Sequence, residues 1–304
     1  MELAEIRAFV SIVDMGSFVQ AASFLNLSQP AISRRIGLLE KELGIVLFDR
    51  QPAGAILTEA GEAYLPFARR VLATIEDGYE LMREFKEGAQ GAIKLALVGT
   101  LASTDLTEKL KTFRAKYPDI RLSLRTARSS EVSLMVRSGE THLGLRYFDD
   151  ENPTIHSQVI ATERMVVVCA NHAQEVNDAE IDVEELKGMS WVSFPMDARS
   201  SGDPFARLLR RQLTIAGLDD ADMITIDSLT AQKRLIESGF GIGLLPISSI
   251  QEELHLGAVK ILHAPTLETA APVVLIYRKQ AYLSQAVQNF LDEILAERQN
   301  ETTS

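Results

Sequence analysis

The chain has 304 residues, enough for two or three domains that each bury a core. Its 46% hydrophobic and 24% charged residues are ordinary for a globular protein, and no apolar run approaches the ~20 residues of a membrane span. Acidic residues and no long apolar run at the start argue against a signal peptide, so we expect a cytoplasmic protein without a membrane partner. The only cysteine, Cys169, excludes a disulfide within the chain, and the five histidines show no metal-ligand spacing.

The first sixty residues carry the pattern of three helices. Apolar residues at helical spacing predict a first helix over residues 3–13. Ser17 and Gln20 have the spacing of a capping box, so a second helix should begin at Phe18. After a break, Ser28 is a good N-cap for a third helix, and Pro30 falls in its first turn, where a missing N–H costs nothing.

The third helix has a buried face and a polar face. Its polar side chains offer hydrogen bonds to base edges and phosphates, and a helix fits the major groove of DNA. The alternative is a plain helical hairpin in a globular core. The predicted buried residues are Ile32, Ile36, Leu39 and Leu43. The predicted DNA-contacting residues are Ser28, Gln29, Pro30, Ser33 and Arg34.

A resemblance decides between these two readings. The stretch GSFVQAASFLNLSQPAISRRIGLLEKELGIVLFDR, from Gly16 to Arg50, and the later LTEAGE are similar to the DNA-binding domain of LysR-type transcriptional regulators. The resemblance runs without a gap from about Leu3 to Gly61. It implies a sequence-specific regulator that binds double-stranded DNA and responds to a small molecule.

Two short β-like runs around Gln51–Gly54 predict a hairpin, the wing of a winged helix-turn-helix, with Arg50 as a phosphate partner. The whole chain has a net charge of −11, and residues 1–62 contain five basic and eight acidic side chains. Bulk attraction to phosphate is therefore not the mechanism, and we expect DNA binding to depend on a few placed basic groups, helix N-termini and dimerisation.

A long helix should follow, capped by Thr58 and reaching about Lys86. Apolar residues at alternating steps of three and four predict a coiled-coil seam, with a core-facing amphipathic helix as the alternative. The resemblance favours a linker helix that joins two subunits into a homodimer, and it implies assembly into homotetramers, with RNA polymerase as a candidate partner. The seam residues are Leu65, Ala68, Leu72, Ile75, Tyr79 and Met82.

From Ala92 onwards strands alternate with helices, which predicts α/β structure with mostly parallel sheets. The resemblance implies two Rossmann-like lobes joined by two crossover strands, similar to type II periplasmic binding proteins. We therefore expect an α/β fold behind the winged helix. The expected divisions are 1–60 for the DNA-binding domain, 58–88 for the linker helix, 91–161 with 267–304 for lobe one, and 162–266 for lobe two.

Ligands of open α/β sheets bind where strands end and helices begin. Hydroxyls and free N–H groups at helix starts also suit anions, so two converging arginines would indicate a carboxylate or phosphate on the effector. In LysR-type regulators the corresponding loops line an effector cleft. The predicted effector-binding residues are Thr100, Ser103, Arg128, Arg146, Phe194, Arg199, Leu229 and Thr230.

The sequence argues against two other classes of protein. An enzyme would need catalytic residues, but the sequence has no Gly-rich phosphate loop, no metal cluster and no Ser/His/Asp arrangement, so we predict no catalytic residues, cofactor or metal. A solute-binding protein is opposed by the winged helix. One departure from the family is His142, where many relatives carry an acidic residue; we expect it at the edge of a strand.

Overall fold

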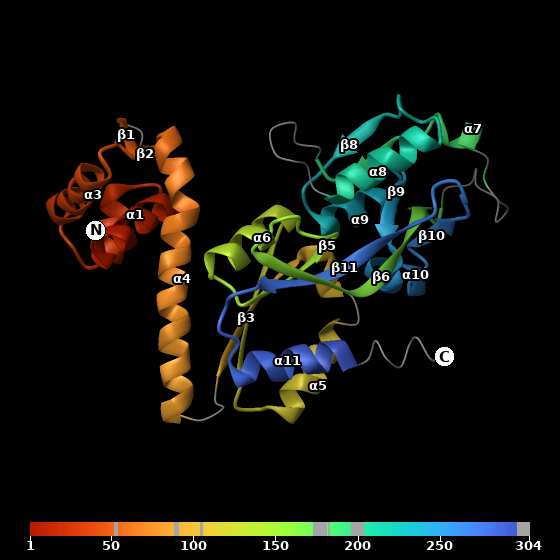
Figure 1. The fold of residues 1–304 in the computed structure, drawn as a ribbon. Coiled ribbons are helices and arrows are strands. Elements are labelled where there is room, and N and C mark those ends of the chain that lie inside the picture. Colours follow the sequence, from red (N-terminus) through yellow and green to blue (C-terminus); the bar gives the residue numbers. More distant parts are fainter. Residues whose placement is uncertain are drawn as a thin grey trace.

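The structure is a computed structural model, and it describes residues 1–51, 54–87, 91–103, 106–172, 181, 183–195 and 204–296. Figure 1 shows three parts: a small helical unit at the N-terminus, one long helix, and an α/β part on the other side of that helix. Within the described residues no helix has both the length and the apolar character needed to cross a membrane.

The N-terminal unit is a winged helix-turn-helix. Its buried core includes Phe9, Ile32, Ile36 and Leu39, so the predicted inner face of the third helix is largely confirmed. Leu43 is the exception, because its side chain is 37% exposed at the end of that helix. The elements are α1 (Leu3–Met15), α2 (Phe18–Phe24), α3 (Gln29–Leu43), β1 (Phe48–Gln51) and β2 (Gly54–Leu57).

The predicted caps of these helices have different outcomes. Helix α2 begins at Phe18 as expected, but the Ser17 side chain makes no capping hydrogen bond, so the predicted capping box is wrong. Ser28 does cap α3, and its Oγ accepts a hydrogen bond from the Ala31 N–H at 3.3 Å. Thr58 likewise caps the long helix, accepting from the Gly61 N–H at 3.1 Å. Local polar spacing therefore located each helix start, although one bond predicted from it is absent.

The long helix α4 (Glu59–Glu87) has 29 residues, which makes it about 44 Å long. It stands between the N-terminal unit and the α/β part (Figure 1). Leu65, Ala68 and Leu72, expected in a dimer seam, pack instead against the core of the N-terminal unit. These three residues face that core and shield its apolar side chains from water. The seam as predicted is therefore wrong in its N-terminal half, whereas Tyr79 and Met82 remain exposed.

Lobe one contains the predicted βαβαβ pattern. Strand β3 pairs in parallel with both β4 and β5, and helix α11 packs on α5, where the rings of Phe113 and Phe290 meet edge to face at 5.0 Å. The elements are β3 (Ala92–Val98), η1 (Gly99–Ser103), α5 (Leu106–Lys116), β4 (Arg121–Ala127), α6 (Ser129–Ser138), β5 (Leu143–Tyr147) and α11 (Gln285–Ala296).

Two long strands connect the lobes. Strands β6 (Ile155–Ala170) and β11 (Thr269–Arg278) pair antiparallel along the whole of β11, with a register irregularity between Val273 and Val274. The main sheet runs in the order β10-β6-β11-β5-β3-β4, with β9 also paired to β6, so both lobes share these two strands. The crossover architecture implied by the resemblance is confirmed. The expectation of mostly parallel sheets is wrong for this sheet, because the two crossover strands run in opposite directions and pair antiparallel with each of their neighbours.

Lobe two is built around the far half of β6. Strands β9 and β10 pair antiparallel with β6, and β10 is an element that the sequence analysis did not predict. Strands β7 and β8 form a separate parallel pair. The elements are α7 (Val183–Leu186), β7 (Trp191–Ser193), α8 (Pro204–Ile215), β8 (Met223–Thr225), α9 (Leu229–Glu237), β9 (Gly243–Pro246), η2 (Ile247–Ile250), α10 (Gln251–His255) and β10 (Val259–Leu262).

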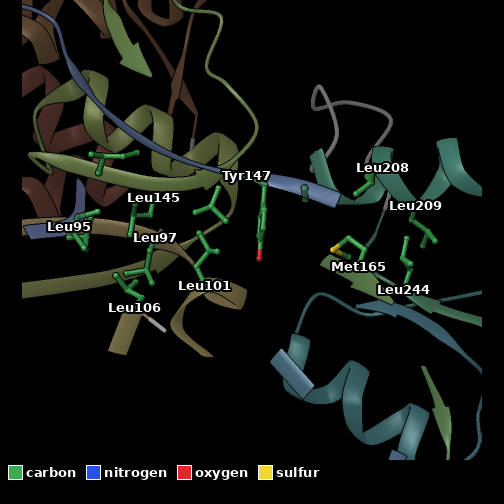
Figure 2. Packing of buried hydrophobic residues seen from close by; sticks show 14 of the residues in the cluster. Leu95, Leu97, Leu101, Leu106, Leu145, Tyr147, Met165, Leu208, Leu209 and Leu244 are labelled. Carbon is green, nitrogen blue, oxygen red and sulfur yellow. The ribbon is translucent and has the colours of Figure 1, made fainter. Parts of the chain in front are cut away.

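One hydrophobic cluster extends through both lobes. In Figure 2, Leu95, Leu97 and Leu145 lie on one side and Met165 and Leu244 on the other, with Tyr147 between the two groups. Cys169 is buried in this cluster, as expected for a small core residue. The lobes therefore share a core at their junction.

Candidate DNA-binding surface and effector cleft

The outer face of α3 presents a short polar strip. Gln29 and Arg34 are exposed and Ser33 is half-buried, which agrees with their predicted orientation. The Gln29 side-chain amide donates to the Ser33 Oγ at 3.3 Å, so these two side chains lie together one turn apart. Ser28 and Pro30 are also exposed at the helix N-terminus, where free N–H groups suit a phosphate.

The hairpin of β1 and β2 lies beside this unit as a wing. Its register pairs Arg50 with Ala55 and Gln51 with Gly54. The Ala55 N–H donates to the Gly16 carbonyl at 3.3 Å, which ties the wing to the turn between α1 and α2. The side chain of Arg50 lies outside the described residues, so its predicted phosphate contact stays a prediction.

Several acidic residues of the N-terminal unit are used inside the fold. The Glu40 carboxylate accepts hydrogen bonds from the backbone N–H groups of Leu47 and Phe48, at 2.8 and 3.3 Å. Asp14 forms an ion pair with Arg69 of α4 at 2.5 Å. These carboxylates fix the wing and the long helix, which explains part of the acidic charge of the N-terminal unit.

The lobe-one side of the cleft follows two neighbouring parallel strands. Val98 and Ala127 are paired at the ends of β3 and β4, so the loops after them begin side by side. Thr100 and Ser129 follow these ends and are 3% and 1% exposed. Among the described residues, neither hydroxyl has a hydrogen-bond partner, although buried hydroxyls almost always have one. Two buried, unsatisfied hydroxyls are suited to a ligand.

The lobe-two side is formed by the start of α9. Ser228 caps this helix by accepting from the Ala231 N–H at 3.4 Å. Thr230 is exposed in the first turn, and Leu229 is half-buried against the core of lobe two. The two lobes meet here, because the Arg128 guanidinium of lobe one and the Asp227 carboxylate of lobe two form an ion pair at 3.7 Å.

Phe194 and Arg146, two further predicted effector-binding residues, lie in different surroundings. Phe194 lines a cavity of about 190 Å³ between β7, β8 and α8. Arg146 is 8% exposed and its guanidinium is bonded within lobe one, to the Ser133 Oγ at 2.5 Å and to Asp150 at 3.3 Å. A ligand that bound Arg146 would have to compete with these bonds. The side chain of Ser103 and all of Arg199 lie outside the described residues.

Sequence reasoning missed two residues that the structure brings to this place. Both lie in loops that the sequence places after strand ends, but neither was among the predicted effector-binding residues. The burial of Ser129 is not visible in the sequence. The ion pair of Asp227 is not visible either, because Arg128 lies far from it in the chain. The signal in the sequence was positional, since each residue follows the end of a strand by two positions.

Comparison with known proteins identifies the family. The model of the LysR substrate binding domain matches residues 86–299, and the model of the bacterial regulatory helix-turn-helix protein, lysR family, matches residues 3–62. The chain is a LysR-type transcriptional regulator. The families it matches are those of regulators and not of enzymes, and LysR-type regulators bind DNA and small-molecule effectors.

Relatives of this regulator cover most of its length. The regulator TfdS of Cupriavidus pinatubonensis is 30% identical over 82% of this chain and 83% of the relative. YofA of Bacillus subtilis is 27% identical over 97% of this chain and 98% of the relative. Among solved structures, CbnR has a TM-score of 0.67 at 23% identity, over 97% of this chain and 98% of the CbnR chain. A full-length OxyR variant from Pseudomonas aeruginosa has a TM-score of 0.72 at 21% identity, over 97% of this chain and 94% of the OxyR chain. The similarity to the CbnR and OxyR structures, at 23% and 21% identity, shows the fold alone.

Proposed function

We propose that this LysR-type regulator acts in the cytoplasm as a homodimer that reads a partly two-fold DNA site with two α3 helices and their wings. Ser28, Gln29, Pro30, Ser33 and Arg34 would contact the DNA, with Arg50 on the phosphate backbone. The observation that carries this proposal is the exposed polar strip on α3 above a fully packed core. A structure of CbnR is of a complex with its target DNA, and it has a TM-score of 0.65 with this chain.

We propose the following division of the chain. Residues 1–60 form the DNA-binding domain and 58–88 the linker helix. Residues 91–161 with 267–304 form lobe one, and 162–266 form lobe two. A homotetramer and contact with RNA polymerase are further proposals, and they rest on the family alone.

The dimer surface that we propose is the side of α4 turned away from both lobe one and the N-terminal core. At 100° per residue, four apolar side chains fall on this side: Phe67, Val71, Met82 and Phe85. They are 40 to 80% exposed in the single chain. A stripe of this kind along a 29-residue helix is unfavourable in water and is typical of a helix that pairs with another.

The DNA-binding proposal is tested by footprinting the purified protein on genomic DNA, followed by mobility shifts on the best site at stepped salt. We expect a compact site with partial two-fold symmetry. Diffuse binding, or none at physiological salt, would contradict the proposal.

A single substitution tests the role of α3. Gln29→Ala should weaken binding to that site by about 10- to 100-fold, because one bidentate base contact contributes about 1–3 kcal/mol of discrimination. The matched control is Gln251→Ala, which removes an exposed helical glutamine in lobe two and should leave the affinity unchanged. Equal affinities for the two variants would exclude Gln29 from base recognition.

We further propose that a small effector binds in the cleft between Thr100 and Ser129 of lobe one and Leu229 and Thr230 of lobe two. Arg128, at the cleft, would bind a carboxylate or phosphate of an anionic effector. Ser103, Phe194 and Arg199 would complete the site, and Arg146 would support it through Ser133. The buried and unsatisfied hydroxyls of Thr100 and Ser129 carry this proposal.

The hydroxyl of Ser129 can be tested without knowing the effector. Ser129→Ala should leave the thermal stability unchanged or raise it, because it removes a buried group that lacks a partner. Ser133→Ala, on the same helix, removes a buried hydroxyl that is bonded to Arg146 and should cost about 1–3 kcal/mol. Differential scanning calorimetry of both variants makes the comparison. A Ser129→Ala loss as large as that of Ser133→Ala would show that Ser129 has a structural partner and would contradict the site.

A further inference from the structure

One face of the linker helix α4 is fastened to lobe one. Ala73, Asp77, Glu80 and Glu84 are spaced by four, three and four residues, so they lie along one side of the helix. Three of them are carboxylates, and each is bonded to a different segment of lobe one. This side is opposite the exposed apolar stripe of Phe67, Val71, Met82 and Phe85.

The carboxylate contacts are close and mostly shielded from water. Asp77 forms an ion pair with Arg278 at the end of β11 at 2.7 Å, and both side chains are about 15% exposed. Glu84 accepts hydrogen bonds from the Tyr282 hydroxyl at 2.7 Å and from the Gln285 N–H at 3.1 Å, just before and at the start of α11. These bonds join α4 to two segments that lie about 200 residues away in the sequence.

Glu80, the middle of the three carboxylates, contacts His142, the residue that departs from the family pattern. The His142 Nε2 lies 3.1 Å from Glu80 Oε1, and its Nδ1 accepts a hydrogen bond from the Lys94 N–H at 3.3 Å. Burial by itself would raise the pKa of Glu80, but the hydrogen bond and charge of His142, with Lys94 and Arg83, bring it below the ordinary value. Glu80 is therefore ionised at neutral pH.

The fourth anchor is a close backbone approach. Gly139 ends helix α6 with φ at +75°, and a Cβ built on it would lie 2.2 Å from the Ala73 Cβ. Only glycine fits both the left-handed backbone and the space against α4. Three of the four anchors are polar, and contacts of this kind between parts of a chain are exchanged for water more readily than a hydrophobic core.

The same lobe-one elements reach the effector cleft at their other ends. Helix α6 is about 15 Å long and runs from the buried Ser129 to Gly139, which lies against Ala73 of α4. Strand β5 begins after His142, which contacts α4, and ends at Tyr147 between the lobes (Figure 2). These two elements therefore connect the proposed effector site to the linker helix.

We propose that this face of α4 is a releasable dock that fixes the DNA-binding unit to lobe one, with α6 as the element that couples it to the cleft. The coupling half of the proposal rests on the proposed effector site. An effector that binds the docked and released arrangements with different affinity shifts the balance between them, and so changes the placement of the two α3 helices in a dimer.

The test uses two alanine substitutions in the full-length protein. Gly139→Ala places a methyl group against Ala73 and forces α4 away from lobe one. Gly217→Ala is the matched control, because Gly217 also follows a helix with φ at +71°, but nothing lies within 4 Å of its Cβ. Both variants carry the same backbone strain, so a difference between them reports the contact with α4. A third variant, Ala73→Gly combined with Gly139→Ala, restores the space.

The readout is the distance between spin labels on Ser23→Cys in α2 and Thr112→Cys in α5, measured by double electron–electron resonance with excess unlabelled protein. Both positions are exposed, whereas Cys169 is buried and burial raises the pKa of its thiol, which slows its labelling. We expect one narrow distance in the parent and in Gly217→Ala, a broadened and longer distribution in Gly139→Ala, and recovery in the double variant. Affinity for the footprinted site should change about fivefold or more on release.

Each outcome decides one part of the proposal. The same distribution in Gly139→Ala and Gly217→Ala would overturn the dock, whatever the DNA or effector experiments give, because the distance needs neither ligand. Release with unchanged affinity for the footprinted site would overturn the coupling and leave the DNA-binding proposal intact. If the parent protein gives no footprint on genomic DNA, the proposed function is contradicted, whereas the dock is still decided by the distance measurement.

Discussion

Met82→Glu combined with Phe85→Glu should convert the protein into monomers and weaken binding to its DNA site by about 100-fold or more. The two side chains are 57% and 80% exposed on the apolar stripe of α4, where the proposed interface would bury them. A carboxylate in such an interface loses its hydration without gaining a partner. Two linked DNA-binding units also gain about 10²- to 10⁴-fold in affinity over one, and this gain disappears on dissociation.

Size-exclusion chromatography with light scattering measures the mass, and mobility shifts measure the affinity. The matched control is Ile215→Glu combined with Leu256→Glu, since these apolar residues are 62% and 71% exposed elsewhere on the molecule. The control should keep the mass and the affinity of the parent. A dimeric Met82→Glu, Phe85→Glu variant would place the subunit interface on another surface.

Phe9→Ala should destabilise the winged helix by about 3–5 kcal/mol and abolish specific DNA binding. The side chain is fully buried at the centre of the N-terminal core, and its ring lies 5.3 Å from the rings of both Phe48 and Tyr64. These contacts join α1 to the wing and to the linker helix. Truncation leaves a cavity among elements that cannot close it, because each is held by other contacts.

Chemical unfolding followed by circular dichroism gives the change in stability, with Phe24→Ala as the control. Phe24 is 64% exposed at the end of α2, so its loss should cost little. The α/β part has separate clusters, and its unfolding should be unaffected by Phe9→Ala. A loss below about 1 kcal/mol would show that the core repacks around the missing ring.

Features set by neighbouring residues could be predicted from the sequence. Ser28, Pro30 and the apolar spacing of Ile32, Ile36 and Leu39 fixed the start and the inner face of α3, because capping and helical periodicity depend on nearby residues only. Alternating strands and helices indicated the α/β part for the same reason. The resemblance then supplied the order of the lobes, which periodicity could not have given.

The tertiary structure decided which face of each element meets which neighbour. The spacing of Leu65, Ala68 and Leu72 is that of a seam, but spacing does not name the partner, and the core of the N-terminal unit takes them. Arg146 was expected to emerge towards the cleft, but it is buried in β5, where Asp150 and Ser133 hold its guanidinium. The anchoring of α4 through Asp77, Glu80 and Glu84 joins residues 62 to 201 positions apart. Such pairs form only when the whole chain is folded, because their energies depend on burial and distance and leave no periodic mark in the sequence.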